Sequence, residues 1–326
     1  MNGGLFMWKR LLCGCVAVIC VASFTACGKD TMQQISDESE SIEQTSASAS
    51  LGYRETVLYY ATDDGFMVPV MKMIPWEEGI GKAALRCLVN TPENRLAAAK
   101  MGLAATIPEG LEFSLRIGDN AEAAVDLSEM PDLGSMEKEA AMITSIVNTL
   151  TEFPTIDTVS FTVNGKKTDS LPCGTGIRGA FSNISLNAEG AVETSAGGEA
   201  VSMTLFFPNQ GATLNVPVTR YGAGEANIES AITALIEGPG NSGLRNCFPE
   251  GTSLLYADLF DGSATVNLSA EFLSARYTEG LAEAAYRTMF LTANAIEPIY
   301  ELNILVEGKP FEFDEQLHAP VWANEF

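Results

Sequence analysis

An internal repeat constrains the fold of this chain more than any other feature. Four short motifs occur twice, in the same order, at offsets of 141 to 148 positions. They are Val-Pro-Val (68–70 and 216–218), Pro-Glu-Gly (108–110 and 249–251), Val-Asp/Asn-Leu-Ser (125–128 and 266–269) and Val-Asn/Glu-Gly-Lys (163–166 and 306–309). Solenoid repeats have periods of about 20–50 residues, whereas each copy here is long enough to bury its own core. The sequence therefore predicts two tandem domains of one fold.

Hydrophobic periodicity and turn residues predict the same order of elements in both copies. Expected strands are 56–61, 66–73, 112–117, 123–127 and 158–163, then 203–207, 213–219, 253–260, 264–268 and 300–306. Expected helices are 78–89, 93–101 and 136–153, then one capped by Asn227 and one starting near Thr278. Ser135 is the expected N-cap of the long helix. Each Pro-Glu-Gly motif predicts a type I turn with glycine fourth. The fold class is α+β, with helices on one face of a small mixed sheet in each domain.

Changes in composition divide the chain into six segments. The predicted segments are a lipoprotein signal peptide (1–27), a tether (28–52), a first domain (53–169), a connector (170–200), a second domain (201–314) and a C-terminal tail (315–326). The tether lacks aromatic residues and is rich in Ser, Thr, Gln, Glu and Asp, so we expect it not to fold by itself.

The N-terminal segment resembles a bacterial lipoprotein signal. Lys9 and Arg10 precede an apolar run, which ends in Thr25-Ala26-Cys27. This run is short for a membrane span and typical of a signal peptide. We expect cleavage before Cys27 and lipidation of its thiol; the alternative is an uncleaved anchor helix. Both alternatives place the domains outside the cytoplasm, held at the outer face of the cell membrane.

Charge and residue usage exclude several classes of function. The chain has 19 Lys and Arg against 42 Asp and Glu, so its surface repels nucleic acid and anionic lipid headgroups, and neither is expected as a direct ligand. Its one histidine, His318, limits metal and nucleophile–histidine chemistry. Beyond the signal and Cys27, the cysteines are Cys87, Cys173 and Cys247, and they occupy non-equivalent positions in the two copies. The sequence thus predicts no catalytic residue, no cofactor and no metal site.

Two basic residues occupy equivalent positions. Lys72 and Arg220 each follow a Val-Pro-Val motif by one residue. One interpretation is an intradomain ion pair or a solvated strand end. The other is a contact with the sister domain or with a protein partner, which makes both residues candidate interaction sites.

These motifs resemble the GerM family of sporulation and germination lipoproteins, which carry two GerM domains. The resemblance rests on residues 205–207, 216–220, 234–239 and 248–252 in the second copy and 58–60, 148–153 and 163–165 in the first. It implies a fold like the ring-building motif of secretion-system subunits. It also implies a role in envelope assembly during endospore formation, with channel components as partners and no known catalytic residues.

The resulting hypothesis is a non-enzymatic, lipid-anchored protein that helps to assemble an envelope complex in sporulation or germination. The alternative is a lipoprotein that binds cell-wall glycan or a small solute in an aromatic-lined cleft. Alternation along strands leaves about half of Tyr59, Tyr60, Phe206 and Phe207 free to line such a cleft. An extracytoplasmic hydrolase is disfavoured, because no nucleophile motif is present.

Overall fold

The computed structural model describes residues 52–190, 201–222 and 225–326. Its first half, here domain 1, has seven strands and three helices. Eight of these ten elements overlap the strands and helices expected above, and the other two are two-residue strands in loops. In chain order they are β1 Tyr53–Thr62, β2 Met67–Pro75, α1 Ile80–Cys87, α2 Pro92–Ala99, β3 Leu103–Ala104, β4 Glu112–Ile117, β5 Glu122–Ser128, α3 Met136–Thr151, β6 Thr158–Val163 and β7 Ala180–Phe181.

Domain 2 repeats this plan. Its elements are β8 Val201–Pro208, β9 Asn215–Gly222, α4 Ile228–Glu237, β10 Leu254–Phe260, β11 Ser263–Leu268, the 3-10 helix η2 Ala270–Tyr277, α5 Leu281–Ile296, β12 Glu301–Val306 and β13 Lys309–Pro310. The predicted N-caps are confirmed: Ser135 accepts the Lys138 N–H at the start of α3, and Asn227 accepts the Ser230 N–H at the start of α4.

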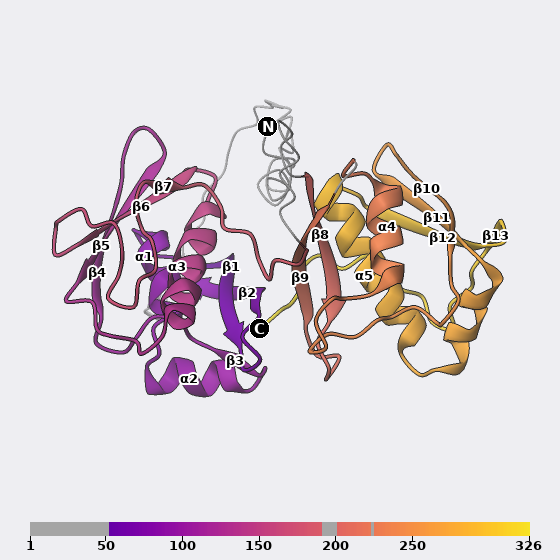
Figure 1. The fold of residues 1–326 in the computed structure, drawn as a ribbon, viewed down its shortest axis with the longest axis horizontal. Helices are drawn as coiled ribbons and strands as arrows, with labels where there is room; N and C mark the ends of the chain where they lie inside the picture. Colours follow the sequence, from indigo (N-terminus) through magenta and orange to yellow (C-terminus); the bar gives the residue numbers. More distant parts are fainter. Residues whose placement is uncertain (1–51, 191–200, 223–224) are drawn as a thin grey trace, which may run out of the picture.

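Each domain has a helical layer between two β layers (Figure 1). In domain 1 the sheets are β2-β1-β3 and β4-β5-β6-β7; in domain 2 they are β8-β9 and β10-β11-β12-β13. The four-stranded sheets are mixed, because β5–β6 and β11–β12 pair in parallel while their neighbours pair antiparallel. The α+β prediction with small mixed sheets is confirmed. The single sheet expected in each domain is split, however, since the opening hairpin bonds separately on the far side of the helices.

Helix α3 also covers the edge of β1. The Thr149 hydroxyl accepts the Tyr59 backbone N–H at 3.1 Å, and Ser145 donates to the Tyr59 carbonyl. In domain 2, Thr292 of α5 accepts the Phe206 N–H at 3.0 Å in the same way. These buried hydroxyls supply the hydrogen bonds that a neighbouring strand would otherwise make, so the edge is closed to further pairing.

The Pro-Glu-Gly motif forms the same turn in both domains, but the prediction of a type I turn was wrong. The hydrogen bonds join the Leu111 N–H to the Pro108 carbonyl and the Thr252 N–H to the Pro249 carbonyl. Glycine is therefore the third residue of each turn, with φ of +84° in both copies. A positive φ at the third position belongs to a type II turn, and this requirement explains the glycine.

Candidate functional site

The two domains meet where β2 and β9 lie side by side, and the half-buried side chain of Asn187 forms a clamp that joins them there. Asn187 accepts the Met67 N–H at 2.8 Å through Oδ1. Its Nδ2 donates to the Met67 carbonyl at 2.8 Å and to the Pro217 carbonyl at 2.6 Å. One side chain thus bonds the backbone of both domains.

A second clamp repeats this pattern with the domains exchanged. Asn324 Oδ1 accepts the Asn215 N–H at 2.8 Å, and Nδ2 donates to the carbonyls of Asn215 and Pro69, both at 2.9 Å. Met67 and Pro69 are the sequence equivalents of Asn215 and Pro217, 148 positions earlier. The junction therefore has approximate two-fold symmetry, and each clamp contacts equivalent backbone atoms.

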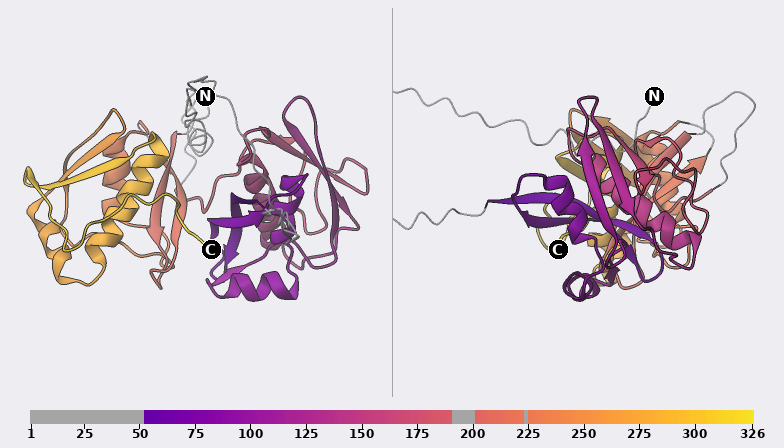
Figure 2. Two further views of the ribbon diagram at one scale, coloured as in Figure 1. Left: turned by 180° about the vertical axis from the view of Figure 1, so that it is seen from behind. Right: turned by 90° about the vertical axis from the view of Figure 1, so that its left-hand side faces the viewer.

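Each clamp lies in a segment that follows one domain and pairs with the other. After domain 1, the Leu186 carbonyl accepts the Thr219 N–H of β9, and the Glu189 N–H donates to the Thr219 carbonyl. After domain 2, the Asn324 carbonyl accepts the Met71 N–H of β2, and the Phe326 N–H donates to the Met71 carbonyl. Figure 2 shows the C-terminal segment crossing to domain 1. Parts of the predicted connector and tail are thus ordered parts of the junction.

We call these two crossing segments, residues 186–189 and 324–326, the exchanged segments. Lys72 and Arg220 each lie against one of them. Lys72 Nζ is 4.3 Å from the ring centroid of Phe326. Arg220 pairs with Glu189 at 2.9 Å and also donates to the carbonyls of Ala234 and Gly238 at the end of α4. The Arg220 side chain is only 17% exposed, so these contacts inside the molecule occupy most of it. An additional contact of either residue with another protein stays a prediction.

The four aromatic residues considered for a ligand cleft are all in the interior. Tyr59, Tyr60, Phe206 and Phe207 are each at most 6% exposed. Alternation does not expose half of them, because helices cover one face of each hairpin and the domain junction covers much of the other. The expectation that some of them line a cleft was wrong.

The three cysteine thiols in the described part of the chain all have raised pKa values. Burial raises the pKa of the Cys87 thiol, and it raises the pKa of Cys247 to about 11. A hydrogen bond to Asp132 raises the pKa of Cys173. All three thiols are therefore poorly ionised at neutral pH, unlike activated cysteine nucleophiles. His318 is exposed. In this described part of the chain, no group of three or more His, Cys, Asp and Glu side chains is placed to hold a metal.

One buried carboxylate has a clear structural role. Glu139, in the first turn of α3, is fully buried and accepts the backbone N–H groups of Cys173 at 2.7 Å and Thr175 at 3.1 Å. Burial alone raises the pKa of such a carboxyl, but these hydrogen bonds outweigh it and hold the pKa of Glu139 below its usual range. Glu139 thus fixes the start of the segment that leads to the first clamp.

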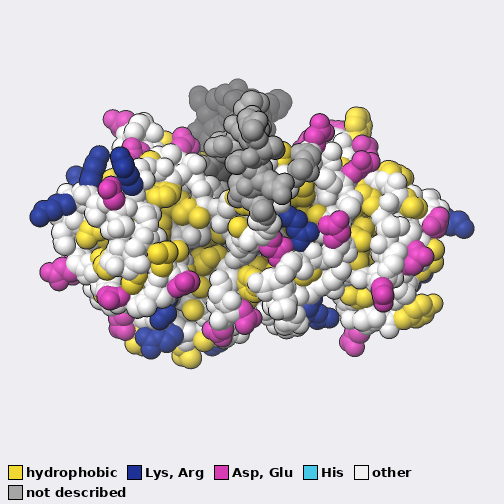
Figure 3. All heavy atoms as spheres, viewed as in Figure 1, with side chains coloured by type: hydrophobic (Ala, Val, Ile, Leu, Met, Phe, Trp, Pro, Cys, Tyr) yellow, Lys and Arg dark blue, Asp and Glu magenta, His cyan; other side chains and the backbone are white. Residues whose placement is uncertain are grey.

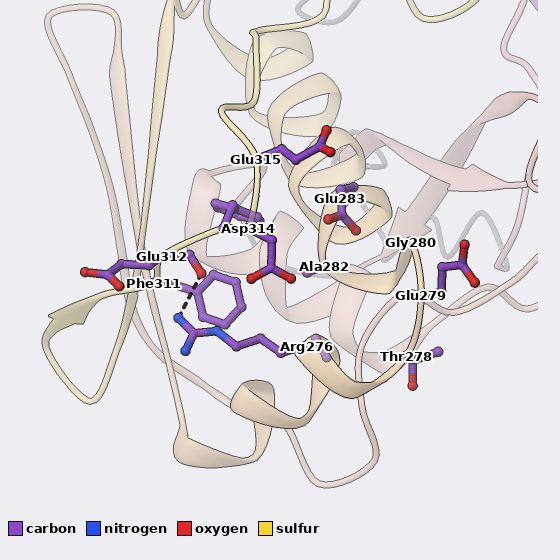
Figure 4. A pocket seen from close by; sticks show the side chains of 12 residues that line it. Arg276, Thr278, Glu279, Gly280, Ala282, Glu283, Phe311, Glu312, Asp314 and Glu315 are labelled. Carbon is purple, nitrogen blue, oxygen red and sulfur yellow. Dashed lines mark hydrogen bonds between the residues drawn. The ribbon is translucent and has the colours of Figure 1, made fainter.

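A small pocket in domain 2 lies between η2, the start of α5 and residues 311–315 (Figure 4). Its volume is about 220 Å³, below the roughly 300–1,000 Å³ typical of small-molecule sites. Arg276 lies over the Phe311 ring at 4.4 Å and donates to the Glu312 carbonyl at 2.8 Å. In Figure 4 the Glu312 and Glu279 side chains point away from each other. Its charged lining consists of five acidic side chains and Arg276, and Arg276 is already held by the pocket wall.

The solvent-facing side of β10 distinguishes domain 2 from domain 1. Tyr256, Asp258 and Phe260 alternate with the buried Ala257 and half-buried Leu259, and Phe260 is 77% exposed. The pairings of the neighbouring strands place Ser114 and Arg116 at the equivalent positions of domain 1, and the Gly118 N–H bond to the Glu122 carbonyl places Gly118 opposite Glu122, as Phe260 is opposite Ser263. We call the surface formed by Tyr256, Asp258 and Phe260 the outer face of β10. It carries exposed aromatic rings where its duplicate is polar or lacks a side chain.

Charge is also distributed unequally. Residues 53–190 contain eleven Lys and Arg against nineteen Asp and Glu, whereas residues 201–326 contain five against sixteen. On the face shown in Figure 3, basic side chains are correspondingly more frequent over domain 1, on the left. Cys27 lies outside the described residues. Within them, no helix combines the length and apolar character needed to cross a bilayer.

Comparison with known proteins identifies the repeated unit. The family model Germane, described as "Sporulation and spore germination", matches residues 57–169 and 204–312. The chain is 26% identical over 302 residues to the spore germination protein GerM of Bacillus subtilis (strain 168), covering 88% of this chain and 80% of the relative. The structure of the tandem GerMN domains of the sporulation protein GerM from Bacillus subtilis matches with a TM-score of 0.64 and 22% identity. It covers 84% of this chain and 99% of that chain, and it supports the fold. Because the two family matches together span more than half of the sequence, the chain belongs to the Germane family of sporulation and spore germination domains.

Proposed function

We propose that this protein is a non-enzymatic, membrane-anchored component of an envelope protein complex that acts in sporulation or germination. Membership of the Germane family and the similarity to a spore germination protein support the sporulation-related role. The raised thiol pKa values and the exposed single histidine support a binding role rather than a catalytic one.

The outer face of β10 is the observation that carries the docking part of the proposal. Solvent-facing sides of antiparallel strands are normally polar, as in domain 1. In domain 2, Tyr256 and Phe260 are 42% and 77% exposed. Tyr and Phe are enriched at protein–protein interfaces, where a few aromatic side chains supply most of the binding free energy. We therefore assign this face to the protein partner.

The junction supports this role by fixing the orientation of the two domains. Two clamps and two exchanged segments connect β2 and β9. A partner bound to domain 2 is then held at a defined position relative to domain 1. Such pre-organisation reduces the entropic cost of assembling a complex.

The double variant Tyr256→Ser/Phe260→Ser is expected to lose its partner. Truncating an aromatic anchor costs about 2 kcal/mol of binding free energy, so the pair should cost about 4 kcal/mol and weaken binding roughly a thousandfold. The measurement is recovery of crosslinked complexes from the native host during spore formation. Ser114→Ala/Arg116→Ala, at the equivalent positions of domain 1, is the matched control. Unchanged recovery from a folded double variant would refute this docking face.

Cys27→Ser is expected to abolish lipid modification and release the protein from membranes. The small residues before Cys27 and the apolar run upstream support lipidation at this thiol. Mass spectrometry of the intact protein and membrane fractionation test it. An unmodified Cys27 in the wild-type protein, or an unchanged membrane fraction for the variant, would contradict lipidation and favour an uncleaved anchor.

A further inference from the structure

The base of the β1–β2 hairpin exposes a second group of large apolar side chains. Tyr53 is in the last pair of the hairpin, opposite Pro75, and Trp76 follows Pro75 directly. Met73 pairs with Glu55, two residues further in. Their exposed fractions are 62%, 56% and 48%, respectively. In the right-hand view of Figure 2, this end of the hairpin projects from the body of the molecule. We call Tyr53, Met73 and Trp76 the hairpin base.

The chemistry of the hairpin base suits the interfacial zone of a bilayer. Trp and Tyr rings favour this zone because each combines an apolar body with a polar group. The Arg54 guanidinium lies 5.7 Å from the Trp76 ring and 5.5 Å from the Phe153 ring, so its cation is beside the aromatic surface. A buried aliphatic stem with a charge near headgroups is typical of interfacial arginine.

The position of the hairpin base in the chain points to the same occupant. The Trp76 N–H donates to the Gly52 carbonyl at 2.6 Å, which fixes the point where the chain enters domain 1. Cys27 precedes this point by 25 residues. A tether of the flexible kind predicted from the sequence would span on the order of 27 Å on average. If Cys27 is anchored as proposed, the local concentration of bilayer surface is high, and an intrinsic dissociation constant in the millimolar range suffices for contact.

The surrounding charges favour the neutral part of the interface over anionic headgroups. Glu55, Glu77 and Glu78 are exposed near the hairpin base, and of these Glu77 pairs with Arg86 at 2.7 Å. The acidic groups offset Arg54, so electrostatic attraction to an anionic surface is absent. Apolar burial of the rings is then the source of affinity, and salt should change it little.

We propose that Tyr53, Met73 and Trp76 dock domain 1 onto the lipid bilayer, so that the protein is oriented on the membrane and not merely tethered to it. This inference rests on the proposed anchoring at Cys27. It adds an orientation: the hairpin base faces the lipid, and the rest of the two-domain unit extends from this contact.

Tryptophan quenching tests the contact. The variant Trp8→Phe/Trp322→Phe retains Trp76 as its single tryptophan. The full chain is reconstituted in phosphatidylcholine vesicles whose acyl chains are brominated near the headgroup. We expect the Trp76 emission to shift to the blue on vesicles relative to the protein in solution. On brominated vesicles we expect it to be weaker than on unbrominated ones, and salt should not change either effect. Adding Tyr53→Ser and Met73→Ser should reduce the quenching while the far-ultraviolet circular dichroism is unchanged.

Two further samples separate the contact from the anchor. Trp8→Phe/Trp76→Phe keeps Trp322, which packs with Val57 and Tyr59 near the junction and should not be quenched. The chain from Gly28 onward, with an N-terminal histidine tag, is held on nickel-chelating lipids and compared with and without bromine. If the full chain does not float with vesicles, the proposed anchoring fails, but this tagged sample still tests the contact. If Trp76 keeps its solution spectrum on nickel lipids, the hairpin-base proposal is overturned whatever the anchor.

Discussion

Asn187→Ala and Asn324→Ala are each expected to lower the free energy of unfolding by about 2–4 kcal/mol, and together to uncouple the two domains. Asn187 makes three hydrogen bonds to Met67 and Pro217, and Asn324 makes three to Asn215 and Pro69. Alanine supplies neither the donor nor the acceptor. The buried backbone groups of Met67, Pro69 and Pro217 then lose their partners, and their desolvation is no longer compensated.

Calorimetry and small-angle scattering measure the two parts of this prediction. The wild-type protein should unfold in one cooperative transition, because the exchanged segments make the folding of each domain depend on the other. The double variant should unfold in two transitions and show a larger radius of gyration. Asn120→Ala is the matched control, since Asn120 is exposed and bonds only Glu122 at 3.2 Å among the interactions found for its side chain. A single transition at the wild-type temperature in the double variant would show that the clamps do not couple the domains.

The positions of the strands and helices within each domain were predictable because local sequence carries that information. Alternating apolar residues gave β6 at Thr158–Val163 without error, and the Ser135 and Asn227 caps located the starts of α3 and α4. The helix η2 at Ala270–Tyr277 was missed. Its residues lack a clear periodic pattern, and a 3-10 helix of this kind depends on the packing of Phe272 and Ala275 into the core.

The junction could not be predicted, because it depends on contacts between segments far apart in sequence. Asn187 and Asn324 have equivalent roles but are 137 positions apart, whereas the strands that they join are 148 apart. A fixed offset therefore does not align the two clamps. Residues 181–187 and 321–326 also lack any turn or helix pattern that would set them apart from linkers. Lys72 and Arg220 gave the one usable signal, since both were singled out as equivalent bases and both lie against an exchanged segment.

The residues of the outer face of β10 could be predicted from the sequence only in part. The strands β4 and β10 were both expected, and comparing the two copies position by position would pair Ser114 with Tyr256 and Gly118 with Phe260. The register that makes this comparison valid includes a β-bulge between Leu254 and Tyr256. A bulge shifts which residues face solvent, and its location is set by the pairing with β11.

Glu139→Gln is expected to lower the free energy of unfolding by about 1–3 kcal/mol at neutral pH. The Glu139 carboxylate accepts the N–H groups of Cys173 and Thr175 through different oxygens. Glutamine keeps one acceptor and places an NH₂ group against the other N–H donor. The equivalent residue of domain 2 is Ala282, so domain 2 retains its own helix start and the loss is confined to domain 1.

The cost of Glu139→Gln should also depend on pH. The pKa of Glu139 is lowered in the folded state relative to its ordinary value of 4.5. Its contribution is therefore complete above that value and is lost as the pH falls through the lower, folded-state pKa. Urea unfolding of both proteins across the acid range should show the difference in stability shrinking as the pH falls. Glu137→Gln, an exposed neighbour in the same turn, should cost less than about 1 kcal/mol. A Glu139→Gln protein as stable as wild type at neutral pH would mean that the two N–H groups find other acceptors and that Glu139 does not hold the segment leading to Asn187.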